Sequence, residues 1–270
     1  MVNELKIGII GGSGMEDPAF IKDYSSQMVS TPYGNPSSEM VIGKIADFPV
    51  AILSRHGLGH SINPTNVNYR ANIWALKDHG CTHILSTTAC GSLREDIKPG
   101  DFVFPDQFID RTSRRISTFY DDSHVQHVPM GSPFCQKTRM ALQKQAKELG
   151  LKFHLNRTVV TIEGPRFSTK AESNLFRSWG CDIINMSTIP EVILARECGL
   201  CYQSIGMSTD YDCWRENEED VTMEMIFSVM AGNAENVKRL IIDTIPTLSI
   251  FDCKCQSFYN NLKQEEAKNS

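Results

Sequence analysis

The feature that most restricts the fold of this chain is a buried strand that ends in acids. Residues 204–209 form a run of apolar and small residues, typical of a strand inside an α/β sheet. Asp210 and Asp212 follow, and side chains two residues apart on an extended chain point to one face. Ligands of open α/β sheets bind outside the carboxyl ends of the strands. The run therefore predicts two acids in a binding site, with capping of the next helix as the alternative.

The first predicted strand, residues 6–10, runs into the glycine turn Gly11-Gly12-Ser13-Gly14. A glycine turn after a buried strand lets backbone N–H groups approach an anion closely. A dinucleotide-binding fingerprint would need a third glycine leading into a helix, whereas Pro18 follows here. The turn therefore indicates an anion site that includes the Ser13 hydroxyl, and it argues against a dinucleotide oxidoreductase.

Two further predicted strands end in hydrogen-bond donors. Residues 50–54 lead into Arg55 and His56, and residues 83–92 become rich in hydroxyl groups around Thr88. Arginine offers a planar fork of donors, and histidine adds another. These groups suit an oxyanion such as phosphate, although the Arg-His pair alone also fits an incidental surface turn.

A second group of residues suits a flat ring. The predicted strand 153–162 is followed by Phe167, whose side chain can stack on a heterocycle. Ser168 and Thr169 come next, and either could be the N-cap of a helix predicted over residues 170–179. A nitrogen heterocycle beside a phosphate site is the combination that an enzyme acting on nucleosides requires.

Composition fits one domain spanning residues 1–270, with a short helix and a polar tail over about residues 246–270. The chain is 41% hydrophobic and 22% charged, near the globular average. A net charge of −5 without a basic cluster argues against nucleic-acid and polybasic membrane contacts. The apolar runs are too short for a membrane span, and the N-terminus does not read as a signal peptide. A cytoplasmic location is expected, with the nucleus as the alternative.

The nine cysteines form an odd, scattered set, which predicts mostly free thiols. Cys198 with Cys201 and Cys253 with Cys255 could together supply four thiolates to zinc, but these pairs lie far apart and match no known finger spacing. Packing thiols are favoured for the first pair and an exposed, redox-sensitive pair for the second. No metal site is therefore expected.

The chain resembles the 5′-methylthioadenosine phosphorylase family, which belongs to the trimeric purine nucleoside phosphorylases. The segments that carry the resemblance are residues 7–14, 55–57, 68–76, 87–92, 106–111, 163–168, 185–191 and 209–212. The resemblance implies a single α/β domain whose mixed, partly barrel-like sheet is flanked by helices. It also implies a homotrimer with active sites at the subunit interfaces.

The resemblance assigns roles position by position. Phosphate-binding positions are matched by Ser13, Arg55, His56, Thr88, Ala89 and Ser187. Positions that contact the nucleoside are matched by Phe167, Ser168, Met186, Met223, Ile226 and, from a neighbouring subunit, His127. Asp210 and Asp212 match the acids that recognise the base, which favours adenine because a carboxylate accepts from its exocyclic amine and repels a carbonyl. From the residues alone, Met223 and Ile226 lie on a helical apolar stripe that more often faces a core.

The implied activity is phosphorolysis of 5′-methylthioadenosine to adenine and 5-methylthioribose 1-phosphate, a glycosyltransferase (pentosyltransferase) reaction of purine and methionine salvage. Asp210 is the expected acid at the purine imidazole nitrogen, with inorganic phosphate as co-substrate and no cofactor. An adenosine-type phosphorylase of broader specificity is the main alternative. A hydrolytic nucleosidase and a non-catalytic nucleoside-binding protein are less favoured.

Overall fold

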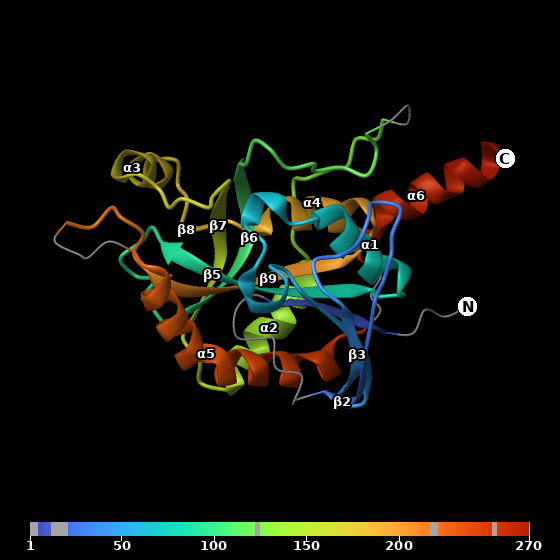
Figure 1. The fold of residues 1–270 in the computed structure, drawn as a ribbon, viewed down its shortest axis with the longest axis horizontal. Helices are drawn as coiled ribbons and strands as arrows, with labels where there is room; N and C mark the ends of the chain where they lie inside the picture. The colour runs from blue at the N-terminus through green and yellow to red at the C-terminus, as the bar shows by residue number, and fades with distance from the viewer. Residues whose placement is uncertain (1–4, 12–20, 122–124, 217–220, 250–252, 270) are drawn as a thin grey trace.

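The computed structural model contains a nine-stranded mixed sheet with helices packed around it (Figure 1). It describes residues 5–11, 21–121, 125–216, 221–249 and 253–269, the last five by their backbone only. The strands are β1 (Ile7–Gly11), β2 (Lys22–Gln27), β3 (Met40–Ile45), β4 (Phe48–Ser54), β5 (His83–Ser92), β6 (Phe102–Arg111), β7 (Phe153–Ile162), β8 (Ile183–Asn185) and β9 (Cys201–Asp210). The helices are α1 (Tyr69–Asp78), α2 (Gln136–Glu148), α3 (Lys170–Ser178), α4 (Thr188–Glu197), α5 (Met223–Thr244) and α6 (Lys254–Asn269). Within the described ranges, none of the helices has the length and apolar character needed to cross a bilayer.

Five of the strands close into a barrel. The hydrogen-bonded order is β2-β3-β4-β1-β5-β8-β7-β6-β9, and β9 pairs back onto β5. Strands β5, β8, β7, β6 and β9 therefore form a mixed closed barrel, while β1 to β4 extend the sheet from β5. This confirms the expected α/β fold with a partly barrel-like mixed sheet.

The pairing pattern gathers strand ends that carry polar groups. Strand β1 runs parallel to β4 and β5, and β5 runs parallel to β9, so the carboxyl ends of these four strands share one edge. Strand β8 pairs antiparallel with the last residues of β5, with Gly91 opposite Ile184. The chain leaving β8 therefore runs back along β5 toward Thr88. The fold thus places the segments that follow β4, β8 and β9 around the end of β5.

The core lies on both faces of the sheet, which explains why β1 has no polar face. Ile10 packs in a cluster with Leu76 of α1, whereas Ile9 packs in a second cluster with Leu240 of α5. Helices α1 and α4 lie above the sheet and α2 and α5 below it in Figure 1. Burying an isoleucine side chain fully contributes roughly 1.5–3 kcal/mol, so this short strand helps to hold both helical layers.

Two strands have no local sequence signal over part or all of their length. Strand β2 is exposed along its whole length and has a polar sequence, so the sequence contains no apolar alternation that would predict it. Its pairing with β3 keeps it extended. Strand β6 begins with the apolar residues 102–104 and continues to Arg111, because β7 offers it a parallel partner along that length. After Arg111, the described residues as far as residue 133 contain no helix or strand.

Candidate active site

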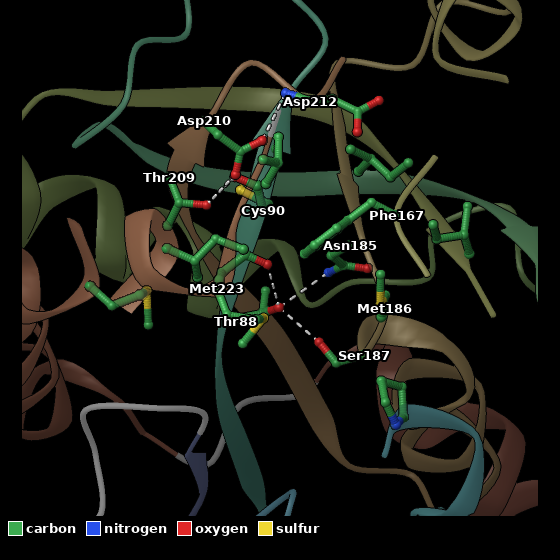
Figure 2. A pocket seen from close by; sticks show the side chains of 18 of the residues that line it. Thr88, Cys90, Phe167, Asn185, Met186, Ser187, Thr209, Asp210, Asp212 and Met223 are labelled. Atoms are coloured by element: carbon green, nitrogen blue, oxygen red, sulfur yellow. Dashed lines mark hydrogen bonds between the residues drawn. The ribbon is translucent and has the colours of Figure 1, made fainter. Parts of the chain in front are cut away.

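A cavity lies at the shared strand edge and contains most of the predicted site residues (Figure 2). The predicted residues that line it are Arg55, His56, Thr88, Ala89, Phe167, Ser168, Met186, Ser187, Asp210, Asp212, Met223 and Ile226. In Figure 2, Asp210 and Thr209 lie at one end and Thr88 and Ser187 at the other. Arg55 and Asp210 therefore face one space, as the sequence argument required.

Two predicted residues are not among those that line the cavity. Ser13 falls outside the described residues. His127 is exposed, and its assignment was to the cavity of a neighbouring subunit, so that role stays a prediction. Phe227, one residue after Ile226, packs its ring edge-on against His60, with 6.2 Å between the ring centroids.

The hydroxyl-rich end is built from β5 and the turn after β8. Thr88 donates to the carbonyl of Ala89 at 2.9 Å, and the hydroxyl of Ser187 lies 2.7 Å from that of Thr88. The amide of Asn185 donates to the Thr188 hydroxyl at 2.7 Å, which fixes the turn from β8 into α4. Two hydroxyl groups that can rotate toward a ligand therefore stand side by side at this end.

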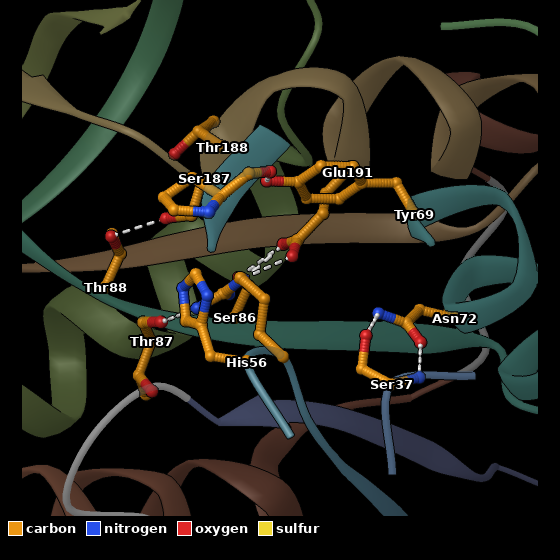
Figure 3. A network of polar contacts seen from close by, with 12 residues as sticks. Ser37, His56, Tyr69, Asn72, Ser86, Thr87, Thr88, Ser187, Thr188 and Glu191 are labelled. Atoms are coloured by element: carbon orange, nitrogen blue, oxygen red, sulfur yellow. Dashed lines mark hydrogen bonds and ion pairs between the residues drawn. The ribbon is translucent and has the colours of Figure 1, made fainter. Parts of the chain in front are cut away.

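Arg55 follows β4 and is held by the fully buried carboxylate of Glu191, which Figure 3 shows among its polar contacts. Glu191, in the first turn of α4, accepts from Arg55 Nε at 2.5 Å and from Nη2 at 3.2 Å. Nη1 donates to the Thr87 carbonyl at 2.9 Å, and Nη2 also donates to Ser86 at 2.6 Å. Tyr202 donates to the same glutamate at 2.8 Å. Four of the five guanidinium N–H groups thus have acceptors among the described residues, so the charge is fixed at one position.

His56 is a neutral acceptor in this arrangement. Its Nδ1 lies 2.9 Å from the carbonyl oxygen of Ile62, which can only accept, so Nδ1 carries the proton. Burial and the neighbouring Arg55 charge lower the pKa of His56 from 6.5 to about 3. The imidazole is therefore uncharged near neutral pH, and its Nε2 carries a lone pair.

At the opposite end, two donors stabilise the carboxylate of Asp210. The Thr209 hydroxyl donates to Oδ2 at 2.7 Å, and the backbone N–H of Asp212 donates to Oδ1 at 2.7 Å. The space beside it depends on Gly91, where a Cβ atom would lie 2.9 Å from Asp210 Oδ1. Asp210 is thus a positioned acceptor at the last residue of β9.

Asp212 lines the cavity, but not because it lies two residues after Asp210 on an extended strand. Strand β9 ends at Asp210, and Asp212 has φ 51°, so the chain is turning rather than extended. Burial raises the pKa of Asp212, more than nearby hydroxyl groups lower it. Neither acid caps the next helix, because the N-cap of α5 is Thr222. The capping alternative is therefore wrong.

The wall between the two ends is largely apolar. Phe167, Met186 and Met223 line it, and Phe167 is 36% exposed, so its ring is accessible to a ligand. Thr169 is the N-cap of α3 and forms a capping box with Glu172. Ser168 is therefore not needed as a cap and faces the cavity.

Sequence reasoning missed three polar residues that shape this site. Glu191 anchors Arg55, Thr209 orients Asp210, and Asn185 fixes the turn that carries Ser187. All three lie inside segments that carry the family resemblance. The partner of Glu191 is 136 residues away, whereas Thr209 and Asn185 bond to near neighbours in a way that no local sequence pattern indicates. An acid in the first turn of a buried helix was the one available signal for Glu191.

The sequence is similar to those of known proteins along most of its length. The model of the phosphorylase superfamily matches residues 6–246. The S-methyl-5′-thioadenosine phosphorylase of Danio rerio is 54% identical over 255 residues, which cover 93% of this chain and 91% of that protein.

The chain also has the same fold as solved structures. A methylthioadenosine phosphorylase from an antarctic soil metagenomic library superposes with a TM-score of 0.89 at 39% identity, covering 95% of this chain and 91% of that one. The methylthioadenosine phosphorylase of Schistosoma mansoni in complex with adenine gives a TM-score of 0.87 at 44% identity, covering 90% and 92%.

Proposed function

The chain belongs to the phosphorylase superfamily and, within it, to the S-methyl-5′-thioadenosine phosphorylases, and from this premise we propose the reaction that it catalyses. Inorganic phosphate cleaves 5′-methylthioadenosine to adenine and 5-methylthioribose 1-phosphate, without a further cofactor. The observation that carries the proposal is the single cavity in which Arg55 and two hydroxyl groups face a pair of acids across an apolar wall.

Phosphate would occupy the end formed by Arg55, His56, Thr88 and Ser187. The remaining N–H of Arg55 and the two hydroxyl groups can donate to its oxygens, and Ser13 and Ala89 are assigned there by resemblance. Neutral His56 cannot donate from Nε2, so it would accept the proton of a hydrogen phosphate oxygen. Holding phosphate under the anomeric carbon makes a bimolecular step effectively intramolecular.

In the reaction, a phosphate oxygen forms a bond to C1′ while the bond from C1′ to N9 breaks. The bonding electron pair goes to the purine, and the sugar passes through an oxocarbenium-like state that the phosphate anion stabilises. The purine needs a proton at its imidazole nitrogen to leave as neutral adenine. General acid catalysis of this kind contributes about 10²–10⁴-fold.

Asp210 remains the proposed donor of this proton to the base, and the proton comes from the pair Asp210 and Asp212. The N–H and O–H groups that bond to Asp210 favour its carboxylate, which also suits acceptance from the amino group of adenine. Asp212, whose pKa burial raises, is the carboxyl group that more readily holds a proton. We infer that the pair shares one proton, which Asp210 delivers as negative charge develops on the purine.

The methylthio group would lie against Met223 and Ile226, since an apolar wall binds a thioether better than a hydroxyl. We also propose a cytoplasmic homotrimer in which His127 of one subunit completes the cavity of the next. Light scattering of the purified protein would give the oligomeric state, and a monomer would exclude the shared cavity.

A substrate panel with phosphate tests the proposal. 5′-Methylthioadenosine and adenosine should be cleaved and inosine should not, because Asp210 repels its carbonyl. Asp210→Ala should lower kcat by about 10²–10⁴-fold while the protein stays folded by circular dichroism. Asp210→Asn, which keeps the shape, separates loss of the charge from loss of packing. Near-normal turnover in both variants would refute the assignment, and binding without turnover in the parent protein would indicate a nucleoside-binding protein.

A further inference from the structure

Four cysteine sulfurs meet at one point away from the cavity. Cys135 precedes α2, Cys201 opens β9, and Cys253 and Cys255 lie at the start of α6. All four sulfur atoms lie within 4.8 Å of one another. The described part of the chain contains no other group of three or more His, Cys, Asp or Glu side chains placed to share an ion.

The sulfur distances fit a shared ion better than covalent bonds. Cys135 Sγ lies 3.7 Å from Cys253 Sγ, which lies 3.3 Å from Cys255 Sγ. A disulfide would need about 2.05 Å. Tetrahedral zinc with metal–sulfur bonds of about 2.3 Å separates its ligands by about 3.8 Å. The observed spacing therefore needs only small side-chain shifts to surround a zinc ion.

Two helix N-terminal ends meet at this cluster, and one of its cysteines is accessible from outside. Cys135 is the N-cap of the 13-residue helix α2 and makes no side-chain capping bond, so the helix dipole favours its anion. Cys253 and Cys255 are at the N-terminal end of the 16-residue helix α6. Cys135, Cys201 and Cys255 are buried, whereas Cys253 is half-buried and accessible to an incoming ion.

Helix α6 has little else to hold it. Among its described side chains only Cys255 and Leu262 are buried, and the helix extends away from the body in Figure 1. Tyr259 packs on Gly199 and under the ammonium group of Lys77, 4.2 Å from its ring centroid. An ion bound by four cysteines would join α6 to α2 and β9 at the point where the helix meets the core.

We propose that these four cysteines bind one structural Zn²⁺ ion that fastens helix α6 to the sheet. Binding converts four thiols to thiolates and releases up to four protons, with no change in oxidation state. An all-thiolate tetrahedral set is the one that zinc uses in closed structural sites. The proposal is independent of the catalytic reaction. It replaces the expectations of no metal site and of a packing thiol at Cys201, and Cys198 lies outside the quartet. The expectation of an exposed pair at Cys253 and Cys255 is wrong, because Cys255 is buried.

The test is the zinc content of the full-length protein, purified without chelator and measured by mass spectrometry of the metal. We expect about one zinc per chain, and cobalt exchanged into the site should give the visible bands of a tetrahedral thiolate complex. Cys253→Ser and Cys255→Ser should each retain less than about a tenth of the zinc under a competing chelator. Cys181→Ser, a buried cysteine outside the quartet, is the matched control and should retain it.

A second readout follows the helix itself. Removing zinc with the chelator should make α6 much more sensitive to limited proteolysis, while the rest of the chain stays resistant. Three outcomes overturn the proposal: four titratable thiols without metal, a mass lower by about 2 Da for each disulfide formed, or zinc that survives both serine substitutions. None of these outcomes bears on phosphorolysis, so this proposal and the proposed function fail separately.

Discussion

Replacing Glu191 with glutamine would leave the charge of Arg55 buried without its counter-ion. Both side chains are at most 1% exposed, and the glutamate accepts from Arg55, Ser86 and Tyr202. Removing one partner of a buried ion pair costs about 3–5 kcal/mol. That is a large fraction of a typical unfolding free energy of about 5–15 kcal/mol. The midpoint of thermal unfolding should therefore fall by roughly 6–20 °C.

Thermal and denaturant unfolding of Glu191→Gln would measure this loss of stability. Activity measured against phosphate concentration at fixed nucleoside should also show a raised KM for phosphate, because Arg55 is no longer held. Glu235→Gln is the matched control, since Glu235 pairs with Lys238 at 3.2 Å on the surface. Its stability should stay close to the parent, because exposed ion pairs contribute little. Replacing both Arg55 and Glu191 with leucine should be less destabilising than Glu191→Gln. Equal stability of the two glutamine variants would refute the reasoning.

Three further predictions concern pH and selectivity. Because burial raises the pKa of Asp212 above 3.8, its contribution to stability is present in acid and lost as pH rises through the raised value. Asp212→Asn should therefore have a higher unfolding temperature than the parent at neutral pH and a similar one near pH 4. The pKa of His56 is lowered from 6.5 to about 3, so its contribution is present above pH 6.5 and lost as pH falls toward 3. His56→Gln should flatten that acidic part of the unfolding profile. Met223→His should lower the kcat/KM of methylthioadenosine relative to adenosine by roughly 10–200-fold, measured with both substrates.

Strands and helices of the core were predictable because their signals are local. Buried β1 and β9 are recognisable as apolar runs in the sequence. Helix α1 ends just before Gly80, a glycine with a φ of 85°. Strand β2 has no such signal, because its exposed polar residues are extended only through pairing with β3. Elements stabilised by a distant partner are therefore the ones that a local pattern misses.

The residues of the candidate site also divide into those that a local pattern predicts and those that depend on a distant partner. Arg55 and Asp210 follow predicted strands and Thr88 lies in the second half of another, and parallel pairing of those strands brings the three residues together. Glu191 could not be identified as the partner of Arg55, because 136 residues separate them. The cysteine quartet shows the same limit, since Cys135 joins Cys253 across 118 residues. Contacts between segments that are remote in sequence can be identified only when the fold is known.

The origin of the oxygen at C1 of the sugar product tests the central claim most directly. 5′-Methylthioadenosine would be incubated with the protein and ¹⁸O-labelled phosphate, and the products separated and weighed by mass spectrometry. The account predicts a sugar 1-phosphate that retains every phosphate label, with no adenine released when phosphate is omitted. Free methylthioribose carrying oxygen from water, formed equally well without phosphate, would contradict it.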